Sequence, residues 1–284
     1  MLNTDGPFYS ALRSKKNYSA DIAACIESTV AHLLDNTTTA RKPGMLLGKV
    51  QSGKTETFLG VVALAFDNGY DVAIVLTKGT KALTEQTYER IRRTYDEFRQ
   101  QEQLQVYDIM AMPTLIGYEL DQKLVVVAKK QKDNLRRLAT ALFERHPELA
   151  RKRILIVDDE ADYASIGFKL TKDERVEINK IAGQIDGIRT KLDRCDFLQV
   201  TATPYSLYLQ PPDSGESDAA YEFEPTHPAF TVLVPEMPGY VGGDYYFGAS
   251  EDEGRAAGLF HRSPPRNLKP CTTMTGGVSG WKTP

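Results

Sequence analysis

The chain has 284 residues, of which 41% are hydrophobic and 26% are charged, with a formal net charge of -3. These totals are ordinary for a soluble globular protein. They neither support nor exclude a nucleic-acid partner, because a binding surface needs only a local basic stripe. The three cysteines lie too far apart for a disulfide framework or a zinc knuckle, and the four histidines are equally scattered. The N-terminus lacks a signal-peptide pattern and no apolar run approaches the roughly 20 residues that span a bilayer, so we expect a cytoplasmic protein without a membrane contact.

The first 39 residues predict a helical segment ahead of the main domain. Ser19 is a typical helix N-cap residue, and apolar side chains recur after it at helical spacing as far as Leu34. A short apolar strand, 45–47, follows and leads into a glycine-rich turn. The segment 56–66 is typical of the helix that comes after such a turn.

Beyond this turn, apolar runs of strand length alternate with longer segments that carry helical patterns. The expected strands are 71–77, 124–128, 153–157 and 197–200, and the expected helices are 80–99, 132–145 and 174–192. Such alternation predicts βαβ units. Continuous apolar strands are typical of a parallel sheet that helices cover on both faces. The fold class predicted for residues 40–210 is therefore α/β.

The sequence changes character after Thr203. Residues 213–255 hold ten acidic side chains and one basic side chain, with many proline, glycine and tyrosine residues. We expect 211–262 to form an acidic extension of the domain. The last segment, 263–284, is rich in proline and glycine and is expected to be a disordered tail.

The sequence GKVQSGKT, at 48–55, matches the P-loop pattern and lies between the short strand and the helix, as a P-loop must. In such a loop, backbone N–H groups and the helix N-terminus bind nucleotide phosphate. Lys54 is expected to reach the β- and γ-phosphates as a catalytic group, and the Thr55 hydroxyl to ligate Mg²⁺. A chance glycine turn is disfavoured by the strand and helix on either side. The predicted ATP-binding residues are Gly48, Gln51, Ser52, Gly53, Lys54 and Thr55.

The acidic run DDEAD, at 158–162, follows the strand 153–157. In open α/β sheets, ligands bind at the carboxyl ends of the strands. Asp159 is therefore the predicted Mg²⁺ ligand, and Glu160 is predicted to orient or deprotonate the water that attacks ATP. Asp158 remains an alternative metal ligand if the strand ends one residue earlier.

Thr201, Ala202 and Thr203 follow the next strand along the chain. Small hydroxyl residues at this place can hydrogen-bond to the carboxylates and relay the state of the nucleotide. We therefore predict that these three residues couple ATP to the rest of the protein.

The order, spacing and residues of these motifs resemble those of the first RecA-like lobe of superfamily 2 helicases. GKVQSGKT resembles motif I, the DEAD run at 159–162 motif II and the TAT sequence at 201–203 motif III. The turn 77–81 resembles motif Ia, and 129–131 occupies the place of motif Ib. The resemblance covers roughly residues 40–205. It implies a RecA-like P-loop fold, ATP and Mg²⁺ as ligands, and nucleic acid as a partner.

The segments VQSGKT, DDEAD and TATP are most similar to those of bacterial helicase-like proteins with a C-terminal endonuclease-type module, the Z-one domain. That resemblance implies DNA as the nucleic acid and a nuclease or defence-system partner. Two features depart from the family pattern. No glutamine precedes the P-loop, so the adenine-reading motif of DEAD-box RNA helicases is absent, and no second RecA-like sequence follows. We therefore expect a truncated or interrupted form of a longer protein, with low ATPase activity on its own.

The resemblance also places nucleic-acid contacts on the motif Ia and Ib loops, where the sequence offers Lys78, Lys81, Lys129 and Lys130. Residues 123–153 hold ten basic and three acidic side chains, and phosphate binding needs such a stripe. A solvated helix face explains the same charges equally well. Nothing in the sequence indicates base reading, so binding is expected to be independent of nucleotide sequence.

These features predict the ATP-binding and hydrolysing lobe of a motor that acts on nucleic acid. The alternative is a nucleotide-binding switch that docks a partner and hydrolyses little ATP. A nuclease module is a third and weaker hypothesis, because the sequence has no convincing carboxylate and lysine cluster of the nuclease type.

Overall fold

The computed structural model describes residues 2–39, 42–49, 53–78, 80–161, 172–202 and 228–236. The chain divides into two compact units, Met1–Met237 and Pro238–Pro284, and every described residue belongs to the first. The predicted tail, 263–284, lies outside the described residues.

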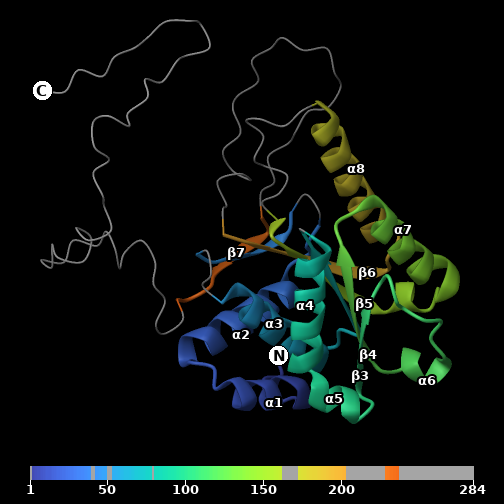
Figure 1. The fold of residues 1–284 in the computed structure, drawn as a ribbon. Coiled ribbons are helices and arrows are strands. Elements are labelled where there is room, and N and C mark those ends of the chain that lie inside the picture. The colour runs from blue at the N-terminus through green and yellow to red at the C-terminus, as the bar shows by residue number, and fades with distance from the viewer. Residues whose placement is uncertain are drawn as a thin grey trace, which may run out of the picture. The chain divides into compact units, whose positions relative to one another are not determined.

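A seven-stranded sheet with the order β3-β4-β2-β5-β6-β1-β7 forms the centre of the first unit (Figure 1). Each strand pairs in parallel with its neighbours. The predicted α/β, RecA-like fold is therefore confirmed. The strands are β1 Gly44–Leu47, β2 Val72–Thr77, β3 Leu104–Asp108, β4 Lys123–Lys129, β5 Arg153–Asp159, β6 Arg194–Thr201 and β7 Phe230–Leu233.

Helices cover both faces of this sheet, and each face has its own apolar core. One core is built with α1 Pro7–Lys16, α2 Ala20–Asp35, α3 Lys54–Asp67, α4 Lys81–Thr94 and α5 Asp96–Gln100. The other is built with α7 Lys132–Thr140, the π-helix η1 Ala141–Arg145, the 3₁₀ helix η2 Leu149–Arg151 and α8 Lys172–Arg189. The short helix α6 Gly117–Leu120 lies between β3 and β4. Figure 1 shows α1 to α4 on one side of the sheet and α7 with α8 on the other. Within the described ranges, no helix is both long and apolar enough to cross a membrane.

The N-terminal helices pack on α3, the helix that follows the glycine-rich turn. Ser19 caps α2 as predicted, since its side chain accepts a hydrogen bond from the N–H of Ile22 (3.3 Å). Helix α1 lies within the predicted helical segment 1–39, although the sequence pattern identified only the helix after Ser19. The carboxylate of Asp67 holds the first turn of α1 by accepting from the N–H groups of Phe8 (3.2 Å) and Tyr9 (2.7 Å). A Cβ atom at Gly6 would lie 2.2 Å from Cγ of Asp67, so this approach requires glycine.

Strand β7 was not predicted either, and it lies inside the expected acidic extension, 211–262. It pairs with β1 in the register Gly44↔Phe230. The ring of Phe230 stacks on His32 with a centroid distance of 5.0 Å, and it fills the space where Gly44 has no side chain. Helices α1 and α2, which precede residue 40, and strand β7, which follows residue 210, therefore belong to the same α/β unit as the sheet between them. The predicted division of the chain into four segments stays a prediction.

Candidate functional site

The glycine-rich turn joins the end of β1 to the start of α3 at the carboxyl edge of the sheet. Gly53 is the N-cap of α3 and has φ of 88°, a left-handed conformation that glycine adopts without steric cost. The N–H of Thr57 donates to the carbonyl of Gly53 (3.1 Å), which closes the first helical turn. The first N–H groups of α3 and its dipole therefore lie at this turn, an arrangement that favours an anion.

The Lys54 ammonium lies against the start of the same turn. It donates to the carbonyls of Gly48 (3.2 Å) and Lys49 (2.7 Å), and the next residue, Thr55, is half-buried. A cation, a hydroxyl and a helix N-terminus thus occur within one short segment, and this donor set suits a nucleotide phosphate with Mg²⁺. The predicted residues Gln51 and Ser52 lie outside the described residues.

The direction in which Asp158 and Asp159 point can be read from the two cores. Side chains alternate between the faces of a strand. On β5, Val157 belongs to the core beneath α1 to α5, whereas Ile156 belongs to the core beneath α7 and α8. Asp159 therefore lies on the same face as α3, and Asp158 lies on the opposite face. This geometry favours Asp159 over Asp158 as the carboxylate that meets a ligand of the glycine-rich turn.

The environment of Asp159 raises the pKa of its carboxyl from 3.8 to about 6. Burial is the main cause and the nearby Glu160 carboxylate adds to it, whereas Lys130 and the N–H of Glu160 act in the opposite direction. That N–H donates to Oδ1 of Asp159 (3.0 Å). Glu160 itself is exposed and has φ of 53°, which is unusual for a residue with a side chain. A carboxylate that is costly to keep charged is a suitable place for a divalent cation.

Strand β6 lies between the two motifs and contacts both. Its Val200 is the register partner of Asp159 on β5, and its Thr201 is the partner of Leu47 on β1. The carbonyl of Thr201 accepts a hydrogen bond from the N–H of Gly48 (3.1 Å). Thr201, the first of the predicted coupling residues, therefore lies beside the start of the glycine-rich turn, and Ala202 follows it. Thr203 lies outside the described residues.

The lysines predicted to contact nucleic acid lie on neighbouring strands at the same edge. Strands β2 and β4 pair in the register Thr77↔Lys129, so Lys78 follows one strand and Lys130 the other. Lys81 is exposed in the first turn of α4, and Lys78 and Lys129 are half-buried.

Lys130 differs from the other three. Its side chain is only 7% exposed, and its ammonium lies 2.8 Å from Oδ1 of Asp158. This placement argues against the predicted contact between Lys130 and nucleic-acid phosphate.

The basic side chains of 123–153 do not form one surface. Lys123 begins β4 and Arg153 begins β5, so both lie at the amino edge of the sheet, away from Lys129. The ammonium of Lys123 contacts the carbonyl of Tyr70 (2.7 Å) and the carboxylate of Asp71 (3.0 Å). Arg153 lies over the Tyr70 ring, 4.1 Å from its centroid, and forms an ion pair with the neighbouring strand. The charge count of the sequence therefore combined cations that lie at opposite ends of the strands.

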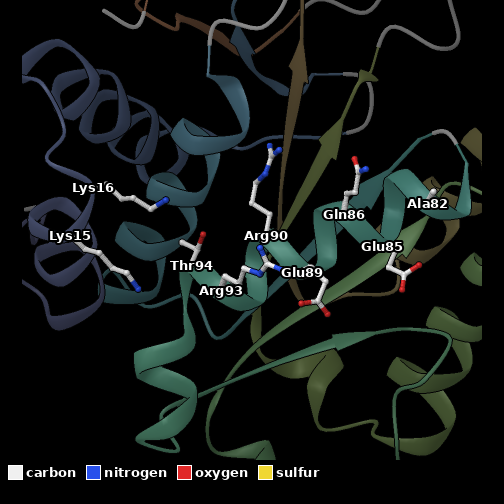
Figure 2. Close-up of a pocket in the computed structure, with 9 residues that line it drawn as sticks. All are labelled: Lys15, Lys16, Ala82, Glu85, Gln86, Glu89, Arg90, Arg93 and Thr94. Atoms are coloured by element: carbon white, nitrogen blue, oxygen red, sulfur yellow. The ribbon is translucent and has the colours of Figure 1, made fainter.

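Two further features of the surface were not predicted. The segment that follows β7 reaches the glycine-rich turn, where Glu236 forms an ion pair with Lys49 (2.5 Å). A hollow of about 680 Å³ lies between the end of α1 and the exposed side of α4, and Figure 2 shows that side chains of both charges line it. Its charged residues are Lys15, Lys16, Glu85, Glu89, Arg90 and Arg93. None of the described residues of the glycine-rich turn or the acidic run lines it.

A family model described as "Type III restriction enzyme, res subunit" matches residues 18–206. The chain belongs to this family. The matched range of the res-subunit family contains the glycine-rich turn, the acidic run and the TAT motif, and the chain thus holds a superfamily 2 helicase-like RecA lobe. No curated protein matches the chain.

Solved structures with a similar fold include two of the DUF1998 helicase MrfA, one bound to DNA and one bound to DNA and AMPPNP. Both are 16% identical to this chain and cover 72% of it and 27% of their own length, with TM-scores of 0.47 and 0.46. The DEAD-box helicase Mss116 bound to ssRNA and UDP-BeF is 12% identical and covers 80% of this chain and 45% of its own, with a TM-score of 0.42. The chain therefore spans about a quarter of the length of MrfA.

Proposed function

We propose that this lobe binds and hydrolyses ATP with Mg²⁺ and drives a motor that acts on nucleic acid. The observation that carries the proposal is the arrangement of three motifs at one edge of the sheet. The glycine-rich turn follows β1, Asp159 ends β5 on the α3 face, and β6 lies between them with a hydrogen bond to the turn. The family match over these motifs supports the same function.

In this reaction, water attacks the γ-phosphate in line with the leaving oxygen. Lys54 balances phosphate charge, and the backbone N–H groups at the start of α3 bind the same oxygens. Thr55 and Asp159 would hold Mg²⁺, which neutralises charge on the β- and γ-phosphates. Glu160 is exposed beside Asp159 and accepts the proton of the attacking water or orients that water.

We further propose that Lys78, Lys81 and Lys129 contact the phosphate backbone of DNA. They share the edge at which β2 and β4 end, and Lys81 is exposed there. Backbone contacts carry no sequence information, so binding would not depend on base sequence. The description of the family as a restriction-enzyme subunit supports DNA as the substrate and a nuclease or defence-system partner.

The test uses three purified variants and the parent. Lys54→Ala is expected to lower ATP affinity in Mg²⁺ by about 100-fold or to abolish it, because it removes a phosphate contact. Glu160→Gln is expected to keep ATP affinity and lose hydrolysis, because the amide cannot accept a proton. Lys15→Ala removes an exposed lysine outside the motifs and serves as the matched control.

Calorimetry gives the affinities, and phosphate release with and without single-stranded DNA gives the turnover. Equal ATP affinity in Lys54→Ala and the parent would refute the ATP site. Tight binding with no turnover, in the presence or absence of DNA, would instead favour the nucleotide-binding switch.

A further inference from the structure

The buried lysine at the end of β4 makes a set of contacts that the proposed function leaves unexplained. The Lys130 ammonium lies 2.8 Å from Oδ1 of Asp158, 2.8 Å from the carbonyl oxygen of Asp159 and 3.0 Å from the carbonyl oxygen of Glu160. An ammonium has three donors, and all three have an acceptor here. Lys130 is therefore bound to each of three consecutive residues of the acidic run.

These contacts fix the backbone of Glu160. The carbonyls of Asp159 and Glu160 belong to the two peptide groups on either side of the Glu160 Cα atom. The orientations of those two groups define φ and ψ of Glu160. One ammonium that binds both carbonyls therefore holds Glu160 in the left-handed conformation, with φ of 53°, that residues with a side chain rarely adopt. This backbone conformation sets the direction of the Cα–Cβ bond of Glu160, from which its carboxylate extends.

A contribution to the stability of the fold does not explain why the Lys130–Asp158 ion pair is buried. Taking a lysine and an aspartate out of water is costly for both ions, and replacing such a pair by apolar side chains is often neutral or stabilising. Both side chains are nevertheless removed from solvent, at 7% and 10% exposure. Asp158 is the first residue of the acidic run, which suggests that the pair serves the geometry of that run.

The main chain of Lys130 connects the same point to a second motif. Its N–H donates to the carbonyl of Thr77 (2.8 Å), the last residue of β2. The adjacent Lys78 is one of the lysines proposed to contact nucleic acid. A single residue thus joins the end of the motif Ia strand to the backbone of the acidic run.

We propose that Lys130 is a positioning residue that holds Glu160 in the conformation required for hydrolysis, with Asp158 as its anchor. The inference rests on the proposed function, since a positioning role requires that the lobe hydrolyses ATP. Lys130 fixes the backbone of the acidic run, and Asp158 forms the ion pair that holds Lys130 in place. Asp159 then remains available to hold the metal.

The experiment compares Lys130→Met, Lys130→Arg and Asp158→Asn with the parent. Lys132→Met is the matched control, because Lys132 is an exposed lysine two residues further along the chain. Single-turnover hydrolysis with excess protein gives the rate of the chemical step. Calorimetry gives ATP affinity, and thermal unfolding shows that each variant is folded. Binding of single-stranded DNA is measured as a function of salt concentration.

Lys130→Met is expected to lower the single-turnover rate about 100-fold, the typical cost of misplacing a catalytic group by about 1 Å. ATP affinity should stay within about twofold of the parent, since the glycine-rich turn is unchanged. Lys130→Arg should recover part of the rate because it restores a cationic donor. Asp158→Asn should show a smaller loss, because the two carbonyl contacts remain. DNA affinity and its salt dependence should not change in any of these variants.

A folded Lys130→Met with the parental rate would overturn the proposal. Loss of DNA affinity with a salt slope reduced by about 1 would also overturn it, because it would make Lys130 a phosphate contact. If Lys130→Met does not fold, Asp158→Asn and Lys130→Arg decide, and parental rates in both would refute the positioning role. A parent that fails to bind ATP refutes the proposed function itself, which separates the two failures. A parent that binds ATP without hydrolysing it refutes both.

Discussion

Replacing Asp159 by Asn should make the metal-free protein more stable at neutral pH. Burial and the Glu160 carboxylate raise the pKa of Asp159 from 3.8 to about 6 in the folded state. The folded state therefore binds a proton more tightly than the unfolded state, and stability contributed by this group falls as pH rises from about 4 to about 6. Above about pH 6 the Asp159 carboxyl is charged in the folded protein, and this buried charge lowers the free energy of unfolding.

The size of that cost follows from the same values. Each tenfold change in the acid equilibrium is about 1.4 kcal/mol, so a pKa raised from 3.8 to about 6 corresponds to at most about 3 kcal/mol. Solvent at the edge of the sheet reduces this value, and we expect a gain of about 1–3 kcal/mol in unfolding free energy for Asp159→Asn at pH 7.5. Asn keeps the shape of the side chain, and its Oδ1 can still accept the hydrogen bond from the N–H of Glu160, which is 3.0 Å in the parent.

Urea unfolding in EDTA at pH 7.5 and at pH 4 measures the gain and its pH dependence. The gain should be present at pH 7.5 and vanish near pH 4, where the parental carboxyl is protonated in the folded state. Added Mg²⁺ and ATP should stabilise the parent more than Asp159→Asn. The matched variant Asp158→Asn should lose stability at pH 7.5, because it leaves the buried Lys130 ammonium without its anion. An Asp159→Asn protein that is no more stable than the parent in EDTA at pH 7.5 would refute the reasoning.

Two further predictions concern the N-terminal helix and the DNA surface. Gly6→Ala should lower the unfolding free energy by about 1–3 kcal/mol in urea titrations, because the new Cβ would lie 2.2 Å from Cγ of Asp67 and disturb the cap of α1; a change below about 0.5 kcal/mol would mean that α1 shifts freely. The double variant Lys81→Glu, Lys129→Glu should weaken binding of single-stranded DNA equally for all sequences and reduce its salt dependence, whereas Arg136→Glu, on the exposed face of α7, should do so much less. Equal losses in both proteins would favour a diffuse basic face over a defined path.

The sequence predicted the strands that carry the motifs, and it missed those at the edges of the sheet. Strands β2, β4 and β5 are continuous apolar runs because helices cover them on both faces, and such runs are visible in a sequence. Strands β3 and β7 are edge strands with alternating burial, and β7 has only four residues. Their apolar side chains are too few to give a period, so only the pairing with β4 and β1 identifies them as strands.

The sequence shows the order of the motifs along the chain. It does not show where their side chains point in the fold, and the predicted site depended on both. The lysines of 123–153 are close in sequence, yet β4 carries Lys123 and Lys129 to opposite edges of the sheet. Nothing in the sequence separates Lys129 from Lys130, since both are cations in the same turn. The structure separates them, because the side chain of Lys130 is directed to Asp158.

The two adjacent aspartates show how strand geometry assigns different chemistry to identical side chains. Asp158 and Asp159 differ by one position, so the alternation of β5 directs them to opposite faces of the sheet. On the face beneath α7 and α8, Asp158 meets a buried ammonium that neutralises it. On the face of α3, Asp159 lies beside Glu160 and its carboxyl keeps a raised pKa. A cation that arrives at this edge would therefore gain more from Asp159 than from Asp158, because Asp158 is already paired with Lys130, whereas the contacts that favour the charged form of Asp159 do not outweigh its burial. If Asp159 holds Mg²⁺ as proposed, binding of the metal would recover the stability that the metal-free lobe loses at this carboxylate, and that free energy would add to the affinity for nucleotide and metal.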